Sequence, residues 1–114
     1  MKKEGSQYLK FGKTHYQRNK SYYLSRNKVR RNRNRDFVHK IKVERGCIDC
    51  SNKDGRVLEF DHLPQYHKVV DISIACNNGW SLEHLQREID KCEVRCANCH
   101  KIKEAERYER ARTV

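Results

Sequence analysis

Apolar residues recur at helical spacing in the first half of the chain. Between residues 15 and 45 there is no Gly or Pro, and Phe37, Val38 and Ile41 stand three and four positions apart. This spacing is typical of a helix with one narrow apolar stripe. Gly46 follows, and glycine often stands just past the last residue of a helix. The pattern therefore predicts a long helix over residues 15–45.

Two short strands are predicted in the second half of the chain. Residues 56–60 alternate apolar and polar side chains, as a half-buried strand does. This strand delivers Asp61 and His62, and Pro64 favours an end to the strand just beyond them. Neighbouring side chains of a regular strand point to opposite faces, so the two can face one ligand only if the strand twists or ends there. Residues 92–95 form the second predicted strand.

Two further helices complete the predicted α+β fold. Ser81 is a suitable N-cap for a short amphipathic helix over residues 82–90. Residues 65–80, just before it, are predicted to be a connection. A final helix is predicted over residues 100–112. Its exposed face is expected to carry interleaved charges, Glu104, Glu106 and Glu109 with Lys103, Arg107 and Arg110.

Positive charge is concentrated in the first part of the chain. The formal net charge is +11, and residues 1–45 carry a net +12 while residues 46–114 carry a net −1. The first 14 residues show no clear period and are expected to form a loosely docked arm. We therefore expect two functional parts: a basic arm and helix, residues 1–45, that attracts polyanions, and a core, residues 46–114, that carries the chemistry.

Four of the six cysteines stand in two Cys-x-x-Cys pairs. Cys47 and Cys50 form one pair and Cys96 and Cys99 the other, and four thiolates at this spacing can close a tetrahedron around one structural Zn²⁺. A chain of 114 residues with 36% apolar residues has little core of its own. A metal bound only by the folded form would stabilise it by about 10 kcal/mol. The other two cysteines lack a partner at ligand spacing and are expected to be small buried residues.

The order of these motifs resembles that of the HNH nucleases, the family with the ββα-metal (His-Me finger) fold. A Cys-x-x-Cys pair begins at Cys47, Asp61-His62 follows at a strand end, and a Cys-x-x-Cys-His motif ending in His100 opens a helix. The match runs from residue 46 to about residue 103. It implies a small zinc-stapled ββα-metal core, here preceded by a long basic N-terminal helix. A small stand-alone nuclease of this kind also resembles phage-encoded HNH proteins.

The resemblance implies a metal-dependent endonuclease that hydrolyses phosphodiester bonds of DNA, with double-stranded DNA as the expected partner. Asp61 and His100 would hold one catalytic divalent ion, Mg²⁺ or Mn²⁺, and His62 would be the general base. Asn98 is a further candidate for this active site. The products would carry 5′ phosphate and 3′ hydroxyl groups, and a homodimer on DNA would be one way to cut both strands.

The basic helix acquires a function in this context. A lone basic run is usually a solvated tail, but beside a nuclease motif it favours binding to DNA through the phosphates. The final helix begins beside the expected metal, so its first turn would also face phosphates. The candidate DNA-binding residues are Lys28, Arg30, Arg31, Arg33, Arg35, Lys101 and Lys103.

Two other functions fit parts of the pattern. In many family members an Asn just before the second strand helps to orient the general base, and that position here is Lys91. This departure favours a non-catalytic zinc-binding adaptor for DNA or RNA. The intact Asp61, His62 and His100 favour an enzyme, because a binding protein has no need of a general base. A redox or disulfide protein would explain the cysteine pairs alone.

No apolar run approaches the roughly 18 residues that a membrane helix requires, and the N-terminus lacks the apolar core of a signal peptide. We therefore expect no membrane partner and a cytoplasmic location, in keeping with a phage-encoded protein that acts inside its host cell. In such a reducing compartment paired cysteines are better explained as metal ligands than as disulfides.

Overall fold

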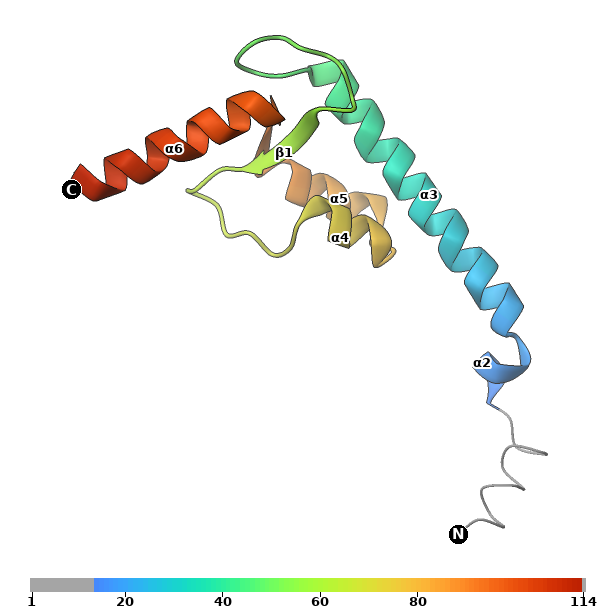
Figure 1. Ribbon diagram of the computed structural model, residues 1–114. Coiled ribbons are helices and arrows are strands. Elements are labelled where there is room, and N and C mark those ends of the chain that lie inside the picture. Colours follow the sequence, from blue (N-terminus) through green and yellow to red (C-terminus); the bar gives the residue numbers. More distant parts are fainter. Residues whose placement is uncertain (1–13, 114) are drawn as a thin grey trace.

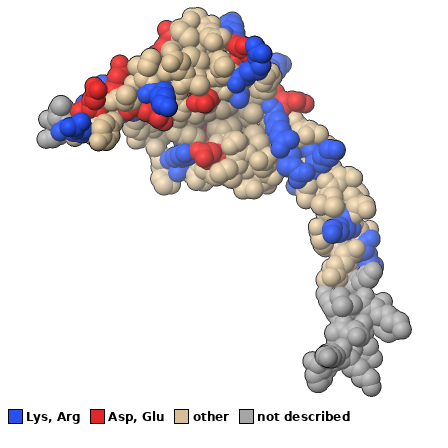
Figure 2. Space-filling view, viewed as in Figure 1, with Lys and Arg blue, Asp and Glu red and all other residues tan. Residues whose placement is uncertain are grey.

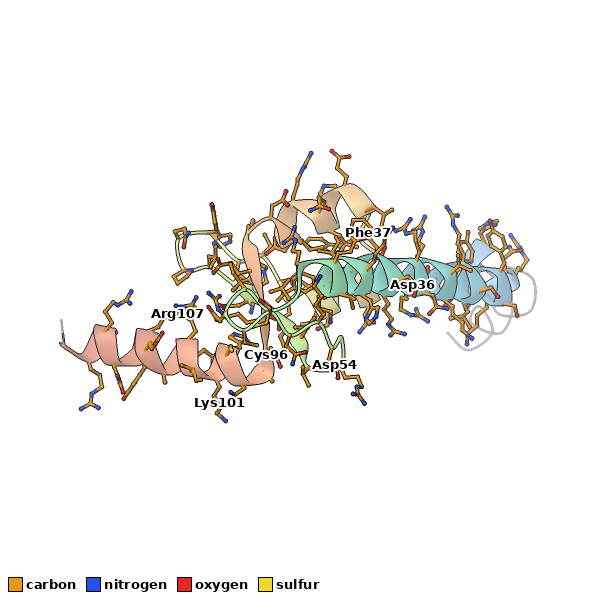
Figure 3. All side chains as sticks on the ribbon, turned by 90° about the horizontal axis from the view of Figure 1, so that it is seen from above. Asp36, Phe37, Asp54, Cys96, Lys101 and Arg107 are labelled. Atoms are coloured by element: carbon orange, nitrogen blue, oxygen red, sulfur yellow. The ribbon has the colours of Figure 1, made fainter. Side chains whose placement is uncertain are left out.

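The computed structural model describes residues 14–113. Its described part is an α+β fold, as predicted, with helices arranged around one two-stranded sheet (Figure 1). The elements are α2 (His15–Arg18), α3 (Lys20–Arg45), β1 (Leu58–His62), α4 (Ile72–Asn77), α5 (Leu82–Ile89), β2 (Cys92–Cys96) and α6 (Ala97–Thr113). Helices α3 and α6 leave the sheet in different directions (Figures 1 and 3).

The predicted N-terminal helix is present with one break. Thr14 caps α2 through its side-chain oxygen, and Asn19 then leaves helical geometry at φ −119°, ψ 27°. Helix α3 continues for 26 residues. Gly46 ends it at φ +68°, a left-handed conformation that favours glycine. All but the last residue of the predicted arm lie outside the described residues.

One apolar core joins α3, α4 and α5. Its buried residues are Val38, Ile72, Ala75, Cys76, Leu85, Ile89 and Cys92. The predicted apolar stripe of α3 and the predicted helix at 82–90 both face this core, and the two cysteines predicted to be small buried residues lie within it. Helix α4 falls inside residues 65–80, which were predicted to be a connection. That prediction was wrong because six residues are too few to show a helical period.

A buried asparagine fixes α3 against this core. Asn34 is fully buried, and its side-chain amide donates to the carbonyl oxygens of Cys76 (3.3 Å) and Trp80 (3.0 Å). Arg33 donates to the Asn34 side chain and to the same Trp80 carbonyl. Arg35 donates to the side chain of the last residue of α4 (2.9 Å). Two arginines of the basic run, Arg33 and Arg35, therefore attach α3 to α4 and to the loop that follows it.

The two strands pair antiparallel, with Leu58 opposite Cys96 at one end and His62 opposite Cys92 at the other. Strand β1 therefore includes both members of the Asp-His pair and ends at His62, just before Pro64 as predicted, but it begins at Leu58 and not at residue 56. A second small core lies at the end of the sheet where Leu58 pairs with Cys96. Its buried residues are Cys47, Leu58, Val94 and Cys96.

Strand β2 leads directly into α6. The helix begins at Ala97 and not at His100 as predicted. The reason is that the Cys96 sulfur accepts a hydrogen bond from the Cys99 backbone N–H (3.4 Å), which is the contact that an N-cap side chain makes. Among residues 14–113, no helix combines the length and the apolar character needed to cross a membrane.

Candidate metal and active site

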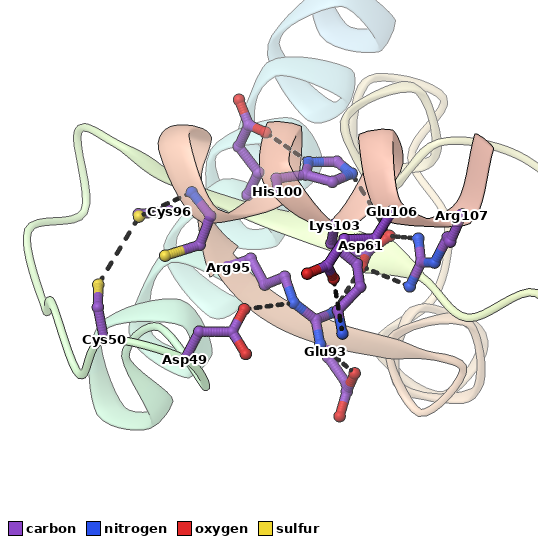
Figure 4. Close-up of polar contacts among 12 residues, drawn as sticks. Asp49, Cys50, Asp61, Glu93, Arg95, Cys96, His100, Lys103, Glu106 and Arg107 are labelled. Carbon is purple, nitrogen blue, oxygen red and sulfur yellow. Dashed lines mark hydrogen bonds and ion pairs between the residues drawn. The ribbon is translucent and has the colours of Figure 1, made fainter. Parts of the chain in front are cut away.

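Four cysteines from two distant segments meet at the start of α6. The sulfurs of Cys47, Cys50, Cys96 and Cys99 all lie within 4.8 Å of one another. Cys50 Sγ and Cys96 Sγ are 3.8 Å apart (Figure 4). The first pair is held by backbone contacts, because Ser51 N–H donates to the Cys47 carbonyl and Ile48 N–H donates to the Val94 carbonyl of β2. The four cysteines are thus positioned to bind a metal ion such as zinc.

The pKa values of these thiols are consistent with a cation bound between the four sulfurs. Burial opposes ionisation of Cys47, but backbone hydrogen bonds from Cys96, Cys50 and Asp49 outweigh it and lower the pKa of Cys47 to about 6. Hydrogen bonding with Cys96, together with burial, raises the pKa of the Cys99 thiol to about 12. Several thiolates cannot ionise side by side without a positive charge between them, and a zinc ion supplies that charge.

Asp61 and His100 lie in contact between strand β1 and α6. Residues two apart on a strand share a face, so Glu59 and Asp61 both point toward the first turns of α6. His100 Nε2 lies 3.4 Å from Asp61 Oδ1 (Figure 4). The same nitrogen lies 3.3 Å from Glu104 Oε1, and Nδ1 of His100 lies 2.7 Å from Glu59 Oε1. One imidazole is therefore surrounded by three carboxylates.

Two arginines hold Asp61, whose side chain is 3% exposed. Arg107 donates to both carboxylate oxygens at 3.0 Å, and Arg95 donates to Oδ2 at 2.5 Å (Figure 4). Burial opposes ionisation of Asp61, but the Arg107 hydrogen bonds and the nearby positive charges lower its pKa below the ordinary value. Arg107 was predicted on the exposed face of α6, and this was wrong. It lies two turns beyond His100 and so faces β1 as His100 does.

His62 has different surroundings on the other face of β1. Its Nε2 lies 3.0 Å from Oε2 of Glu88, a carboxylate of α5 that is 2% exposed. Glu88 also accepts from the Val69 N–H and from Lys91 Nζ. The hydrogen bonds to Lys91, Val69 and His62 outweigh the effect of burial and lower the pKa of Glu88.

A groove of about 820 Å³ runs between α3, β1 and α4 and reaches the start of α6. Both candidate histidines line it, whereas Asp61 is not among the described residues that do so. Its charged and titratable lining combines two cations, three carboxylates and three histidines: Arg35, Lys42, Asp36, Glu59, Asp71, His39, His62 and His100. The structure thus brings Asp61 against His100, and His62 into one groove with His100, while Asp61 and His62 point to opposite faces of β1.

The candidate DNA-binding residues fall into two groups. Lys28 and Arg30 project from α3 and Arg31 is half-buried, whereas the side chains of Arg33 and Arg35 bond to the loop after α4 and to α4 itself. Lys and Arg gather along α3 where it leaves the body of the molecule (Figure 2). On α6, two more candidates follow the last cysteine: Lys101 and Lys103. Lys101 extends into solvent (Figure 3), and Lys103 lies 3.6 Å from Glu106.

Two other sequence candidates lie at the edges of this site. Asn98 is exposed in the first turn of α6, between Cys96 and Cys99 of the cysteine cluster. Lys91, at the position where many HNH proteins have Asn, donates to Glu88 Oε1 (2.9 Å) and to the His67 carbonyl (2.8 Å). The residue at the Asn position therefore contacts the carboxylate that holds His62.

Sequence reasoning missed three charged residues of the site: Glu88, Arg95 and Arg107. A signal was present for two of them. Glu88 stands three residues after Leu85 and next to Ile89, on the apolar face of α5, and Arg107 keeps the helical spacing of His100. Arg95 carried no such signal, because a charged residue in a short strand is usually exposed.

Comparison of the chain with protein-family models, with curated proteins and with solved structures finds no match. The functional assignment therefore depends on the residues and geometry described above.

Proposed function

We propose that this protein is a metal-dependent DNA endonuclease of the HNH type, in which a structural zinc at the four cysteines fixes the active site. The observation that carries the proposal is the contact between Asp61 and His100, made where the cysteine cluster joins the two-stranded sheet to α6. A carboxylate and an imidazole in contact can hold a divalent ion, and such an ion is suited to phosphodiester hydrolysis.

The donor set suits a catalytic Mg²⁺ or Mn²⁺. Asp61 Oδ1 and His100 Nε2 are 3.4 Å apart, a separation that lets both lie within about 2.1 Å of one ion. Such an ion would stabilise negative charge on the phosphate and on the leaving oxygen. The ion could bind only if Arg107 released Asp61, because the ion and the Arg107 guanidinium would compete for the same carboxylate.

His62 is the general base in this proposal. It lines the same groove as His100, and an imidazole there, in its neutral form, can accept the proton of an attacking water. The exposed Lys28 and Arg30 of α3 would bind the phosphates of the duplex.

The test is incubation of supercoiled plasmid with the zinc-loaded protein in Mg²⁺ or Mn²⁺. We expect nicked or linear products with 5′ phosphate ends. His62→Ala, Asp61→Asn and His100→Ala should each lose about 10²-fold or more in rate, and His84→Ala, an exposed histidine of α5, serves as the matched control. Zinc-loaded protein that binds plasmid but leaves it intact contradicts the proposal.

A second candidate function is a zinc-binding adaptor that holds DNA or RNA without cutting it. One observation favours it: Asp61 is buried, and both of its oxygens already accept hydrogen bonds from arginine. In an adaptor this ion-pair network would only join α6 to the two-stranded sheet. The plasmid assay separates the two functions, because an adaptor shifts the mobility of plasmid and produces no new ends.

A further inference from the structure

A buried carboxylate stands behind His62. Glu88 lies in the last turn of α5, between Leu85 and Ile89 of the apolar core, and is 2% exposed. Removing a carboxylate from water costs several kcal/mol unless hydrogen bonds replace the water. A charged residue at this position of an otherwise apolar helix face therefore indicates a partner that requires it.

Glu88 has a full set of partners. Oε2 accepts from the Val69 N–H at 3.0 Å and lies 3.0 Å from His62 Nε2, and Oε1 accepts from Lys91 Nζ at 2.9 Å. Lys91 is itself fixed, because it also donates to the His67 carbonyl at 2.8 Å. The carboxylate is thus held by the chain that follows β1 and by the residue that precedes β2.

The chemistry of this contact determines which nitrogen of His62 carries the proton. An ionised carboxylate only accepts hydrogen bonds, and the lowered pKa of Glu88 keeps it ionised. The nitrogen 3.0 Å away, Nε2, must therefore be the donor. In the neutral ring the lone pair then remains on Nδ1, and a ring held through Nε2 presents Nδ1 in a fixed direction.

We propose that Glu88 is the positioning residue of His62: it holds the imidazole as the Nε2–H tautomer, oriented so that Nδ1 is the nitrogen that accepts a proton in the groove. Its catalytic consequence rests on the proposed nuclease function, whereas the tautomer does not. Lys91, which replaces the Asn that many HNH proteins have before the second strand, supports His62 indirectly by fixing Glu88.

The first measurement is independent of activity. In zinc-loaded protein labelled with ¹⁵N-histidine, we expect His62 to show a single Nε2–H tautomer at a pH where it is neutral. Glu88→Ala should release the ring, so that its nitrogen signals become those of a mobile ring that exchanges between tautomers. Glu88→Gln keeps the size of the side chain and serves if the alanine variant does not fold.

The second measurement is the rate of plasmid cutting. Glu88→Gln and Glu88→Ala should lower kcat by about 10- to 100-fold, part of the 10²–10⁴-fold that a general base contributes, with KM unchanged. One control separates positioning from general loosening of the fold. Glu83→Gln changes an exposed carboxylate of the same helix and should leave the His62 signals and kcat within about threefold of wild type. Lys91→Met removes the Oε1 partner of Glu88 and should lower kcat by less than the Glu88 variants do, because the contact between Glu88 and His62 remains.

The outcomes separate this inference from the nuclease proposal. If His62 shows the Nδ1–H tautomer, or if the Glu88 variants leave its signals and kcat unchanged, the positioning role is overturned while a cutting enzyme remains a nuclease. If the tautomer is as expected and disappears in Glu88→Ala, but wild type never cuts plasmid, the nuclease proposal is overturned. Glu88 would then fix a histidine that serves binding only.

Discussion

The two cores of this protein are stabilised in different ways. The apolar half, formed around α3, α4 and α5, buries the seven residues of the larger core, and none of the seven belongs to the cysteine cluster. The cysteine half, formed by the cysteine cluster, the adjoining end of the sheet and α6, buries four residues, two of which are cysteines of that cluster. Phe60 packs against both cores. We therefore expect the cysteine half to obtain its stability from metal binding by its sulfurs, and the apolar half to obtain its stability from burial of apolar side chains.

The comparison shows how the candidate site is assembled. His62 and Glu88 belong to the apolar half, because Glu88 comes from a helix of that core. Asp61 and His100 meet on the side of the cysteine half. A metal ion at the cysteines would thus be required for the contact between Asp61 and His100. The contact between His62 and Glu88 would persist without the metal.

The largest expected effect is loss of the metal. Removal of zinc by a chelator, or Cys47→Ser, should remove about 10 kcal/mol of metal-binding free energy. The cysteine half should then unfold, while α5 and its contacts remain. Zinc content and amide hydrogen exchange measure this. Cys92→Ala, a buried cysteine of the apolar half, is the control and should keep one zinc per chain. A Cys47→Ser protein that still binds one zinc contradicts the assignment.

Truncation in the apolar core should be the next largest effect. Leu85 is fully buried, so Leu85→Ala should cost about 2–5 kcal/mol without loss of zinc. Denaturant unfolding measures it. Leu82→Ala, on the exposed side of the same helix, should cost less than about 1 kcal/mol. Equal costs at the two positions would show that α5 does not pack as described.

Loss of Arg107 should cost less, because Arg95 still holds Asp61. Arg107→Ala removes two of the hydrogen bonds of Asp61 and should cost about 1–3 kcal/mol near pH 7. Lys101→Ala, exposed on the same helix, is the control, and denaturant unfolding compares the two variants. A loss of stability equal to that of the control would mean that the ion pair of Arg107 with Asp61 contributes nothing.

The same ion pair predicts the acid dependence of stability. Folding lowers the pKa of Asp61, so its ionised form contributes stability that is fully present above the ordinary pKa of about 3.9 and is lost as pH falls through the lower, folded-state pKa. Arg107→Ala should therefore lose less stability than wild type on acidification below about pH 4. If wild type and Arg107→Ala lost the same stability on acidification, the ion pair of Arg107 with Asp61 would not explain the acid dependence.

The smallest effect on stability is expected on the exposed part of α3. Arg30→Ala should change the free energy of unfolding by less than about 0.5 kcal/mol. It should reduce the slope of log affinity for DNA against log salt by about 0.9 for each phosphate that the variant no longer neutralises. Arg56→Ala, in the loop before β1, is the control and should leave the slope unchanged. Equal slopes for wild type, Arg30→Ala and Arg56→Ala would show that the DNA does not bind at Arg30.

The sequence predicted the elements that its period or its chemistry defines. The long basic helix, the helix capped by Ser81, the strand that enters Cys96 and the four-cysteine cluster are all present. The partners of charged side chains could not be predicted, because Arg107 and Glu88 acquire theirs from segments far apart in the chain. The α+β class and a cluster of four cysteines that could bind a metal ion are confirmed, whereas the zinc itself and the roles of Asp61, His62, His100 and the DNA-binding residues stay predictions.

The most direct test of the central claim, that both halves contribute to one active site, is a double-mutant cycle on the single-turnover rate of plasmid nicking. His62→Ala and His100→Ala should each lower the rate by about 10²–10⁴-fold. The double variant should be no slower than the slower single variant, because groups that act in one step are not additive. Losses that multiply, or a zinc-loaded wild type that binds plasmid and never nicks it, would contradict the account.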